Sequence, residues 1–307
     1  MTPPALPMPP PASDAPLPPA RIGDGGVRVL AGVPFAALPG ARPLELDLYL
    51  PAGDGPAPVV VFLHGGGWRL GSRHTAGPAY RDAVPSPFEQ VAQAGVAVAS
   101  VDYRLSAEAV WPAQLHDAKA AVRWLRSRAA ELGVDGDRMA AWGESAGGHL
   151  AELLGLTPDA AALEGEVGVT GPSSRVTAVA AWYAPSDIAA VATDTGADPA
   201  DAATREAQLL GAPVTSVPFL AAQASPISHV SPAAPPVLLL HGRADRFIAC
   251  AQSERLHDAL TAAGTDVQLH TYDDADHMWL GSTAAATDAL ARTVAFLRQQ
   301  LVESTRP

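Results

Sequence analysis

Short apolar runs alternate with helical segments along most of the chain, and this alternation is the strongest constraint on its fold. Runs such as PVVVFLHG and PVLLLHG are continuously apolar, as is typical of strands that are covered on both faces of a sheet. Helical spacing is clearest in residues 112–133, where Leu115, Ala118 and Val122 recur at steps of three and four. Strands that alternate with helices predict parallel strands joined by crossover helices, and therefore an α/β fold.

We expect eight strands in one sheet with helices on both of its faces. The first two predicted strands, residues 27–35 and 44–51, follow each other closely enough to form an antiparallel pair. The other six are predicted over residues 58–65, 96–103, 138–143, 176–185, 236–242 and 266–273. The sheet is therefore expected to be mostly parallel.

Two segments depart from the alternation. Residues 1–26 are rich in proline, and we expect them to form a disordered, solvated tail that packs against nothing. Residues 187–230 are rich in Ala, Pro, Thr and Asp, and a segment of that length inside a compact domain is more often a lid or binding insertion than an idle loop. The predicted organisation is a tail over residues 1–26 and one domain over residues 27–307 that carries this insertion.

Charge and cysteine content narrow the classes of partner. The chain has 32 acidic and 20 basic residues, a net charge of -12 that would repel nucleic acid and anionic membrane surfaces. Its single cysteine, Cys250, cannot form an intramolecular disulfide, and the N-terminal stretch lacks the pattern of a signal peptide. We therefore expect a cytoplasmic protein with no nucleic-acid or membrane partner, and its oligomeric state stays open.

A glycine-flanked serine lies between a predicted strand and a predicted helix. The pattern G-x-S-x-G spans residues 143–147 and has Ser145 at its centre. Such a turn strains the backbone of the serine, which is tolerable only where the residues two positions away lack bulky side chains. The hydroxyl would then stand above the carboxyl edge of the sheet, with the amide of Ala146 facing a developing negative charge. This pattern predicts that Ser145 is a nucleophile; an ordinary Gly/Ser turn is the alternative.

A glycine-rich loop, HGGGW, follows the strand predicted over residues 58–65. No side chain blocks its backbone amides, and it lacks the GxxxxGK[ST] and GxGxxG patterns of phosphate-binding loops. The amides of Gly66 and Gly67, together with that of Ala146, are therefore the predicted oxyanion hole. His64 is expected to shape this loop rather than to act as a base.

The base and the acid that a serine nucleophile requires are expected later in the chain, in the order Ser, Asp, His. Asp245 follows the seventh predicted strand and His277 follows the eighth, so both should emerge at the edge where Ser145 lies. His277 is the histidine that combines this order with this position, and it is the predicted base. Asp245 is the predicted acid, and Asp187, which follows the sixth predicted strand, is its rival.

These motifs resemble those of the α/β-hydrolase superfamily. The matching segments are HGGGW, DYRLS, WPAQLHDAKAAVRWL, GESAGGHLA, HGRAD and DADH, which extend from about residue 57 to the C-terminus. Within the superfamily the chain is similar to HGGG-type carboxylesterases related to hormone-sensitive lipase, and more closely to bacterial feruloyl and acetyl esterase domains. Relatives of hormone-sensitive lipase usually build a cap from N-terminal helices, which the proline-rich tail cannot supply.

The resemblance implies hydrolysis of short-chain or aromatic acyl esters through an acyl-enzyme, with no metal and no cofactor. The expected partner is a small-molecule ester. Trp68, beside the glycine-rich loop, and Trp182, near the end of a strand, are expected to line the substrate pocket. An amidase, an arylformamidase or a peptidase would use the same triad, and a non-catalytic binding protein would use the same scaffold.

Overall fold

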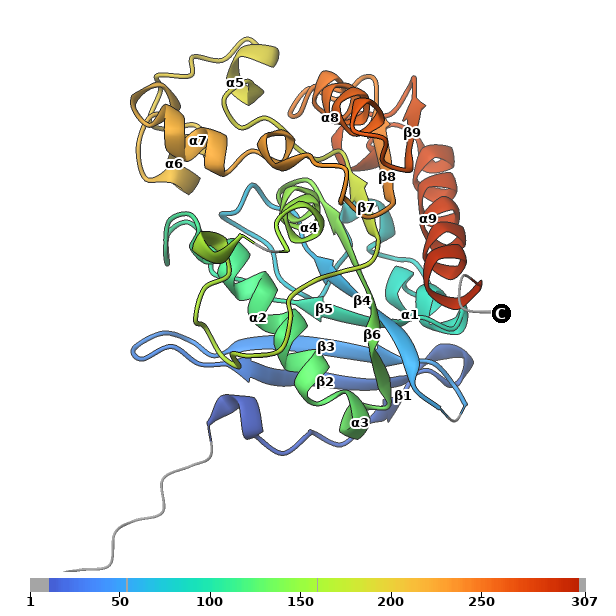
Figure 1. Cartoon of the computed structure of the whole chain (residues 1–307). Coiled ribbons are helices and arrows are strands. Elements are labelled where there is room, and N and C mark those ends of the chain that lie inside the picture. Colours follow the sequence, from blue (N-terminus) through green and yellow to red (C-terminus); the bar gives the residue numbers. More distant parts are fainter. Residues whose placement is uncertain (1–10, 54, 159, 304–307) are drawn as a thin grey trace, which may run out of the picture.

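The fold is known from a computed structural model that describes residues 11–53, 55–158 and 160–303. The described residues form one sheet of nine strands in the order β1-β2-β3-β5-β4-β6-β7-β8-β9, shown in Figure 1. Pairing is antiparallel from β1 through β2 and β3 to β5, and parallel from β5 through to β9. The mostly parallel sheet that the sequence predicts is therefore present, and all eight predicted strands lie in it.

The elements have the following bounds. The strands are β1 (Arg21–Ile22), β2 (Arg28–Ala36), β3 (Leu44–Leu50), β4 (Ala57–Leu63), β5 (Ala97–Val101), β6 (Val134–Glu144), β7 (Val179–Trp182), β8 (Val237–Gly242) and β9 (Val267–Tyr272). The α-helices are α1 (Pro87–Gln93), α2 (Ala113–Ser127), α3 (Ala129–Leu132), α4 (Ala146–Leu156), α5 (Val191–Asp194), α6 (Arg205–Leu210), α7 (Pro218–Gln223), α8 (Ala251–Ala262) and α9 (Thr283–Arg298).

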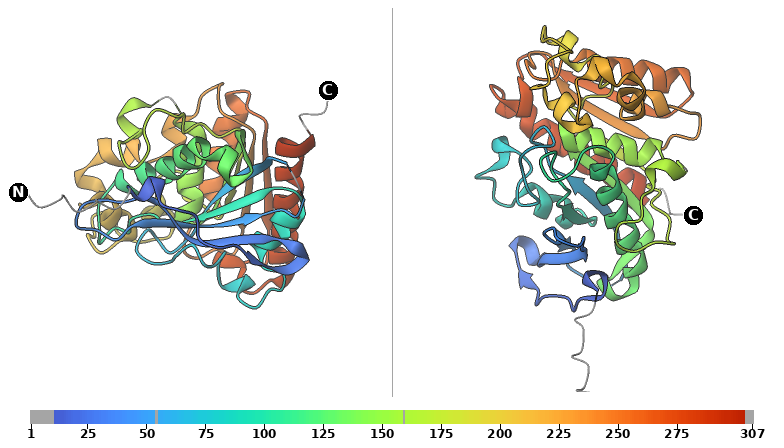
Figure 2. Two further views of the ribbon diagram at one scale, coloured as in Figure 1. Left: turned by 90° about the horizontal axis from the view of Figure 1, so that it is seen from below. Right: turned by 90° about the vertical axis from the view of Figure 1, so that its left-hand side faces the viewer.

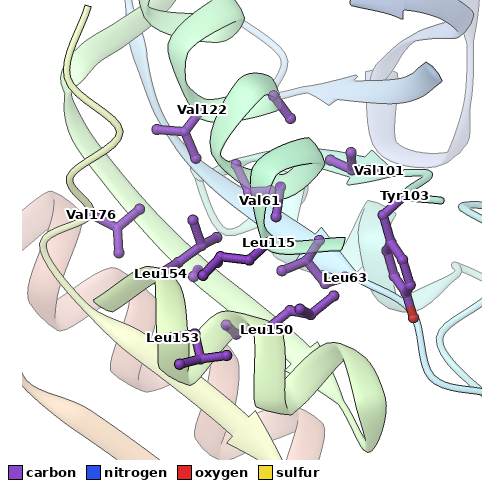
Figure 3. Close-up of a cluster of buried hydrophobic side chains, with 14 of the residues drawn as sticks. Val61, Leu63, Val101, Tyr103, Leu115, Val122, Leu150, Leu153, Leu154 and Val176 are labelled. Carbon is purple, nitrogen blue, oxygen red and sulfur yellow. The ribbon is translucent and has the colours of Figure 1, made fainter. Parts of the chain in front are cut away.

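Helices cover both faces of the sheet, as Figure 2 shows. Alternate residues of β4 face opposite sides: Val59, Val61 and Leu63 pack in a cluster with α2, α4 and α8. Val60 and Phe62 pack in a second cluster with α1 and α9. Figure 3 shows part of the first cluster, in which Val61 and Leu63 lie next to side chains of α2 and α4. Because both of their faces are buried, central strands such as β4 and β8 are nearly continuous apolar runs.

Part of the predicted tail packs against the domain, which corrects the expectation that residues 1–26 contact nothing. β1 pairs antiparallel with the start of β2 and is the ninth strand of the sheet. Upstream of β1, the indole N–H of Trp124 donates to the carbonyl of Ser13 at 2.9 Å. A strand of two residues is too short to show a period of two, which is why the sequence pattern does not reveal it. Residues 1–10 lie outside the described part of the chain, and their disorder stays a prediction.

The parallel strands end at one edge of the sheet, and residues 187–230 lie over that edge. Figure 1 shows α5, α6 and α7 of this segment, here called the insertion, above the ends of the central strands. Trp111 connects the insertion to the domain, because its amide donates to the carbonyl of Leu209 at 2.8 Å and its indole donates to Gln223 at 3.0 Å. In the described ranges, no helix has the length and apolar character that crossing a membrane requires.

A buried carboxyl group lies on α4. The side chain of Glu152 is 1% exposed, and neither of its carboxyl oxygens has a hydrogen-bond partner among the described residues. Burial raises the pKa of Glu152 well above its usual value of 4.5. The folded state therefore holds this proton more tightly than the unfolded state does.

We expect Glu152→Gln to change how the stability of the fold depends on pH. Because the pKa of Glu152 is raised in the folded state, the free energy of unfolding should fall as the pH rises above 4.5, the value that applies to the unfolded chain. The glutamine variant lacks this loss, so its free energy of unfolding minus that of the natural protein should grow as the pH rises above 4.5.

Urea unfolding followed by circular dichroism measures this difference. Glu166→Gln, at an exposed position, is the matched control and should leave the pH dependence unchanged. A Glu152→Gln difference that stays constant across the same pH range would contradict the prediction.

Candidate active site

The turn between β6 and α4 holds Ser145 in a strained backbone conformation, with φ 51° and ψ -120°. A Cβ atom on Gly143 would lie 2.2 Å from the carbonyl oxygen of Gly147. A Cβ atom on Gly147 would lie 2.0 Å from the carbonyl oxygen of Leu63, at the end of β4. Side chains do not approach backbone oxygens so closely, and this is the steric reason that the sequence predicts for the two glycines.

Ser145, His277 and Asp245 form one chain of hydrogen bonds. His277 Nε2 lies 2.9 Å from Ser145 Oγ, and His277 Nδ1 lies 2.6 Å from Asp245 Oδ2. The three residues follow β6, β8 and β9, strands that end at the same edge of the sheet, and all three side chains are largely buried. This geometry allows the imidazole to accept the serine proton while the carboxylate fixes the orientation of the ring.

The surroundings of Asp245 keep it ionised. The amides of Phe247 and Ile248 each donate to its Oδ1 at 2.8 Å. Burial raises the pKa of the Asp245 carboxyl, but the bonds from His241 and His277 outweigh burial and hold that pKa well below its usual range. A fixed negative charge therefore lies beside His277 and favours the imidazolium that forms when the ring takes a proton.

Asp187, the alternative acid, does not contact His277. Asp187 accepts a hydrogen bond from the amide of Ala189 at 3.1 Å, and its own amide donates to the side chain of Gln252 at 2.8 Å. Asp245 is the carboxylate in contact with the His277 ring. This geometry agrees with the preference for Asp245 over Asp187 that the sequence indicates.

A cavity of about 210 Å³ opens beside Ser145 and His277. The glycine-rich loop forms one wall of it, and residues of the insertion, of the loop after β8 and of the loop after β9 form the others. Its walls include apolar, aromatic and charged side chains: Trp68, Arg69, Leu70, Arg205, Glu206, Phe247, Ile248 and Met278. In the described ranges, no three His, Cys, Asp or Glu side chains are grouped as a metal site would require.

Three backbone amides lie unpaired in the wall of this cavity. Gly66, Gly67 and Ala146 line it, and no described residue accepts a hydrogen bond from their amides. The amide of Gly65, in contrast, donates to the buried carboxyl of Glu144 at 3.3 Å. The structure thus leaves free the three amides that the sequence analysis assigns to an oxyanion hole.

The DYRLS motif fixes the glycine-rich loop. The ring of Tyr103 stacks on the ring of His64 with centroids 4.3 Å apart, and its hydroxyl donates to the His64 carbonyl at 2.8 Å. The amide and the hydroxyl of Ser106 donate to the carbonyl of Trp68 at 2.8 and 3.0 Å. Burial lowers the pKa of His64 to about 4, so its ring is neutral and shapes the loop, as the sequence analysis expects.

Trp68 lies in the cavity wall, and a hydrogen bond to His149 fixes its side chain. Its indole N–H donates to His149 Nδ1 at 3.2 Å, and the His149 Nε2–H donates to the carbonyl of Ala224 in the insertion at 2.6 Å. Burial lowers the pKa of His149 to about 4, so the neutral ring has one nitrogen to accept and one to donate. His149 therefore links the glycine-rich loop, α4 and the insertion.

Trp182 does not line the cavity, and its predicted role in binding substrate is wrong. The side chain is fully buried, and its indole N–H donates to the hydroxyl of Thr293 on α9 at 2.9 Å. As the last residue of β7, Trp182 alternates onto the face of the sheet that α1 and α9 cover. A position near the end of a strand does not reveal which face the side chain takes.

Glu144, which lies within the serine motif itself, has a role that the sequence pattern does not reveal. Its buried carboxyl accepts a hydrogen bond from the hydroxyl of Tyr183 at 2.6 Å as well as the bond from Gly65. Burial raises the pKa of Glu144, and the two hydrogen bonds oppose that rise. The Tyr183 ring also packs edge-on against His277, with centroids 4.7 Å apart. Glu144 and Tyr183 therefore connect the glycine-rich loop to the predicted base, His277.

Several non-glycine residues at this site have a strained backbone with positive φ. Among the described residues, the non-glycine residues with positive φ are Trp68, Ser145, Tyr183, Met278 and Trp279. Each is a residue of the site or lies next to one in sequence. Strained backbone of this kind persists where the surrounding packing over-determines it, and it is common at active sites.

Comparisons with known proteins agree with this geometry. The BD-FAE family model matches residues 46–260. The carboxylesterase NlhH of Mycobacterium tuberculosis is 33% identical over 260 residues, which are 80% of this chain and 74% of NlhH. The probable carboxylic ester hydrolase LipM of the same species is 29% identical over 255 residues, and the chain spans 54% of the length of LipM.

A solved structure has the same fold. The truncated form of a carbohydrate esterase from gut microbiota aligns with a TM-score of 0.76 at 29% identity, over 89% of this chain and 95% of that one. The nine-stranded, mostly parallel sheet is therefore the α/β-hydrolase fold.

We expect Gly147→Ala to destabilise the fold strongly. The added Cβ would meet the carbonyl oxygen of Leu63 at 2.0 Å, and backbone must move to relieve the contact. A loss of about 2–4 kcal/mol in the free energy of unfolding is the expected result.

Gly264→Ala is the matched control for that experiment. Its φ is +80° and no atom lies within 4 Å of the added Cβ, so backbone strain alone should cost about 1 kcal/mol. Equal losses for the two variants in urea unfolding would show that the close approach at the serine turn is not restrictive.

Proposed function

Since the chain belongs to the BD-FAE family of α/β-hydrolase esterases, we propose that it is a serine carboxylesterase acting on short-chain or aromatic acyl esters. The observation that carries the proposal is the unbroken chain of hydrogen bonds from Ser145 through His277 to Asp245, beside three unpaired amides. The esterase names of its relatives and of the carbohydrate esterase with a similar fold support the same reaction.

In the first half of the reaction, Ser145 Oγ attacks the ester carbonyl carbon while His277 Nε2 takes the hydroxyl proton. The carbonyl oxygen becomes an oxyanion that accepts hydrogen bonds from the amides of Gly66, Gly67 and Ala146. Each such donor typically contributes about 2.7–4 kcal/mol to stabilising the transition state. The imidazolium then gives its proton to the departing alcohol, which leaves an acyl-enzyme on Ser145.

Water completes the cycle by the same path in reverse. His277 takes a proton from a water molecule, whose oxygen attacks the acyl carbon, and the same amides hold the second oxyanion. Collapse of this intermediate returns the proton to Ser145 Oγ and releases the acid. Asp245 keeps its negative charge throughout, because its pKa lies well below the usual range.

The size and lining of the cavity support a small acyl group. Its volume of about 210 Å³ is below the range of about 300–1,000 Å³ that is typical of ligand pockets. Trp68, Leu70 and Phe247 supply apolar and aromatic wall to receive a short aliphatic or an aromatic acyl chain. Long acyl chains would extend beyond these walls.

Steady-state hydrolysis of p-nitrophenyl esters tests the proposal. We expect a higher kcat/KM for the acetate and butyrate than for the laurate, and loss of turnover in Ser145→Ala. Asp245→Asn should lower kcat by about 10⁴-fold, because asparagine holds the wrong tautomer of the base. Asp187→Asn is the matched control and should stay within a few-fold of the natural protein, because its carboxylate does not contact His277.

Two results would contradict the proposal. Turnover that survives Ser145→Ala would place the nucleophile elsewhere. Faster hydrolysis of matched amides than of esters would assign the same triad to an amidase.

A further inference from the structure

A second cavity, of about 320 Å³, lies beside the first one. The two cavities share four lining residues: Arg69, Arg205, Glu206 and Phe247. The outer cavity lies largely against the insertion and has Arg246 in its wall as well. The four shared side chains therefore stand between the two cavities and border both of them.

Arg205 forms the central part of that boundary. Its guanidinium lies 4.9 Å from the ring centroid of Phe247, and the Phe247 ring lies 5.6 Å from the ring of His277. On its other side, a Cβ atom added to Gly67 would lie 2.7 Å from Arg205 Cδ, so its alkyl chain contacts the glycine-rich loop. Arg205 thus lines the inner cavity and contacts both the glycine-rich loop and the aromatic ring that packs against the base.

The charges around this boundary are unbalanced. Within the described part of the chain, neither Arg205 nor Arg69 has a carboxylate within salt-bridge distance, and Arg69 donates to the neutral side chain of Gln208 at 3.1 Å. Arg246 is paired with Asp276. Glu206 is the one carboxylate that the described lining of the outer cavity contains; burial raises its pKa, and the nearby charges of Arg205 and Arg69 oppose that rise.

Two guanidiniums and one carboxyl line both cavities, and an anionic group on a ligand would balance the excess positive charge that they leave. Arginine stays charged at all physiological pH values and presents a planar fork of donors that fits the two oxygens of a carboxylate. Two guanidiniums that face one carboxyl suit a ligand with a single negative charge.

We infer that the substrate is an ester that carries a carboxylate group, in its acid or its alcohol part, and that Arg205 with Arg69 binds this group. The inference rests on the proposed esterase function and adds a substrate class to it. Arg205 is a specificity residue in the wall of the inner cavity.

Two matched pairs of esters test the inference and locate the charge. A charge in the alcohol part is tested by comparing kcat/KM for 4-acetoxybenzoate and 4-acetoxybenzamide. A charge in the acid part is tested by comparing kcat/KM for monoethyl succinate and ethyl succinamate. Within each pair one carboxylate is replaced by a neutral amide of similar shape. We expect the charged member of at least one pair to be favoured by about three- to tenfold, since hydrogen bonds to charged groups are strong but partly screened here.

Variants then assign the preference to Arg205. Arg205→Gln should bring the ratio of kcat/KM values close to one, whereas Arg205→Lys should retain part of it. Arg28→Gln removes the same charge from an exposed position on β2 and should leave the ratio unchanged. Urea unfolding of each variant checks that the fold is kept.

The outcomes separate this inference from the proposed function. Hydrolysis of the neutral esters without preference for a charged one, or a preference that Arg205→Gln leaves intact, would overturn the inference alone. Failure to hydrolyse any of the four esters or p-nitrophenyl acetate would overturn the proposed function.

Discussion

The rest of the site depends on the close approach between the β6–α4 turn and the end of β4. Gly147 lies so near the carbonyl oxygen of Leu63 that no side chain fits between them. Because the residue after Leu63 begins the glycine-rich loop, this contact sets the distance between that loop and Ser145. The nucleophile and the amides of Gly66 and Gly67 are therefore positioned by one backbone contact between the start of α4 and the end of β4, the strand next to β6.

Buried polar groups then hold this strained arrangement in place. Glu144 connects the glycine-rich loop to Tyr183, whose ring packs against His277. His149 connects the same loop to the insertion through Trp68 and Ala224. Such groups are costly to bury unless they are hydrogen-bonded, so each bond also penalises any movement that would break it. The site is preorganised because Glu144 and His149 cannot give up these hydrogen bonds without leaving buried polar groups unpaired.

The sequence predicts the parts of the site that follow from the direction of the strands. Ser145, Asp245 and His277 each follow a parallel strand, so their convergence at one edge is a consequence of topology. It does not predict the face on which Trp182 lies, because that depends on side-chain alternation at the last residue of a strand. Nor does it predict Arg205 over Phe247, a contact between the first residue of α6 and the loop after β8 that the packing of the insertion determines.

Covalent labelling with a fluorophosphonate, mapped by mass spectrometry, tests most directly whether these loops activate one hydroxyl. We expect a single phosphonylated peptide with the group on Ser145, and labelling slowed by about 10³-fold or more in His277→Ala, because the imidazole no longer takes the proton. Labelling at another residue, or an unchanged rate in His277→Ala, would contradict this expectation.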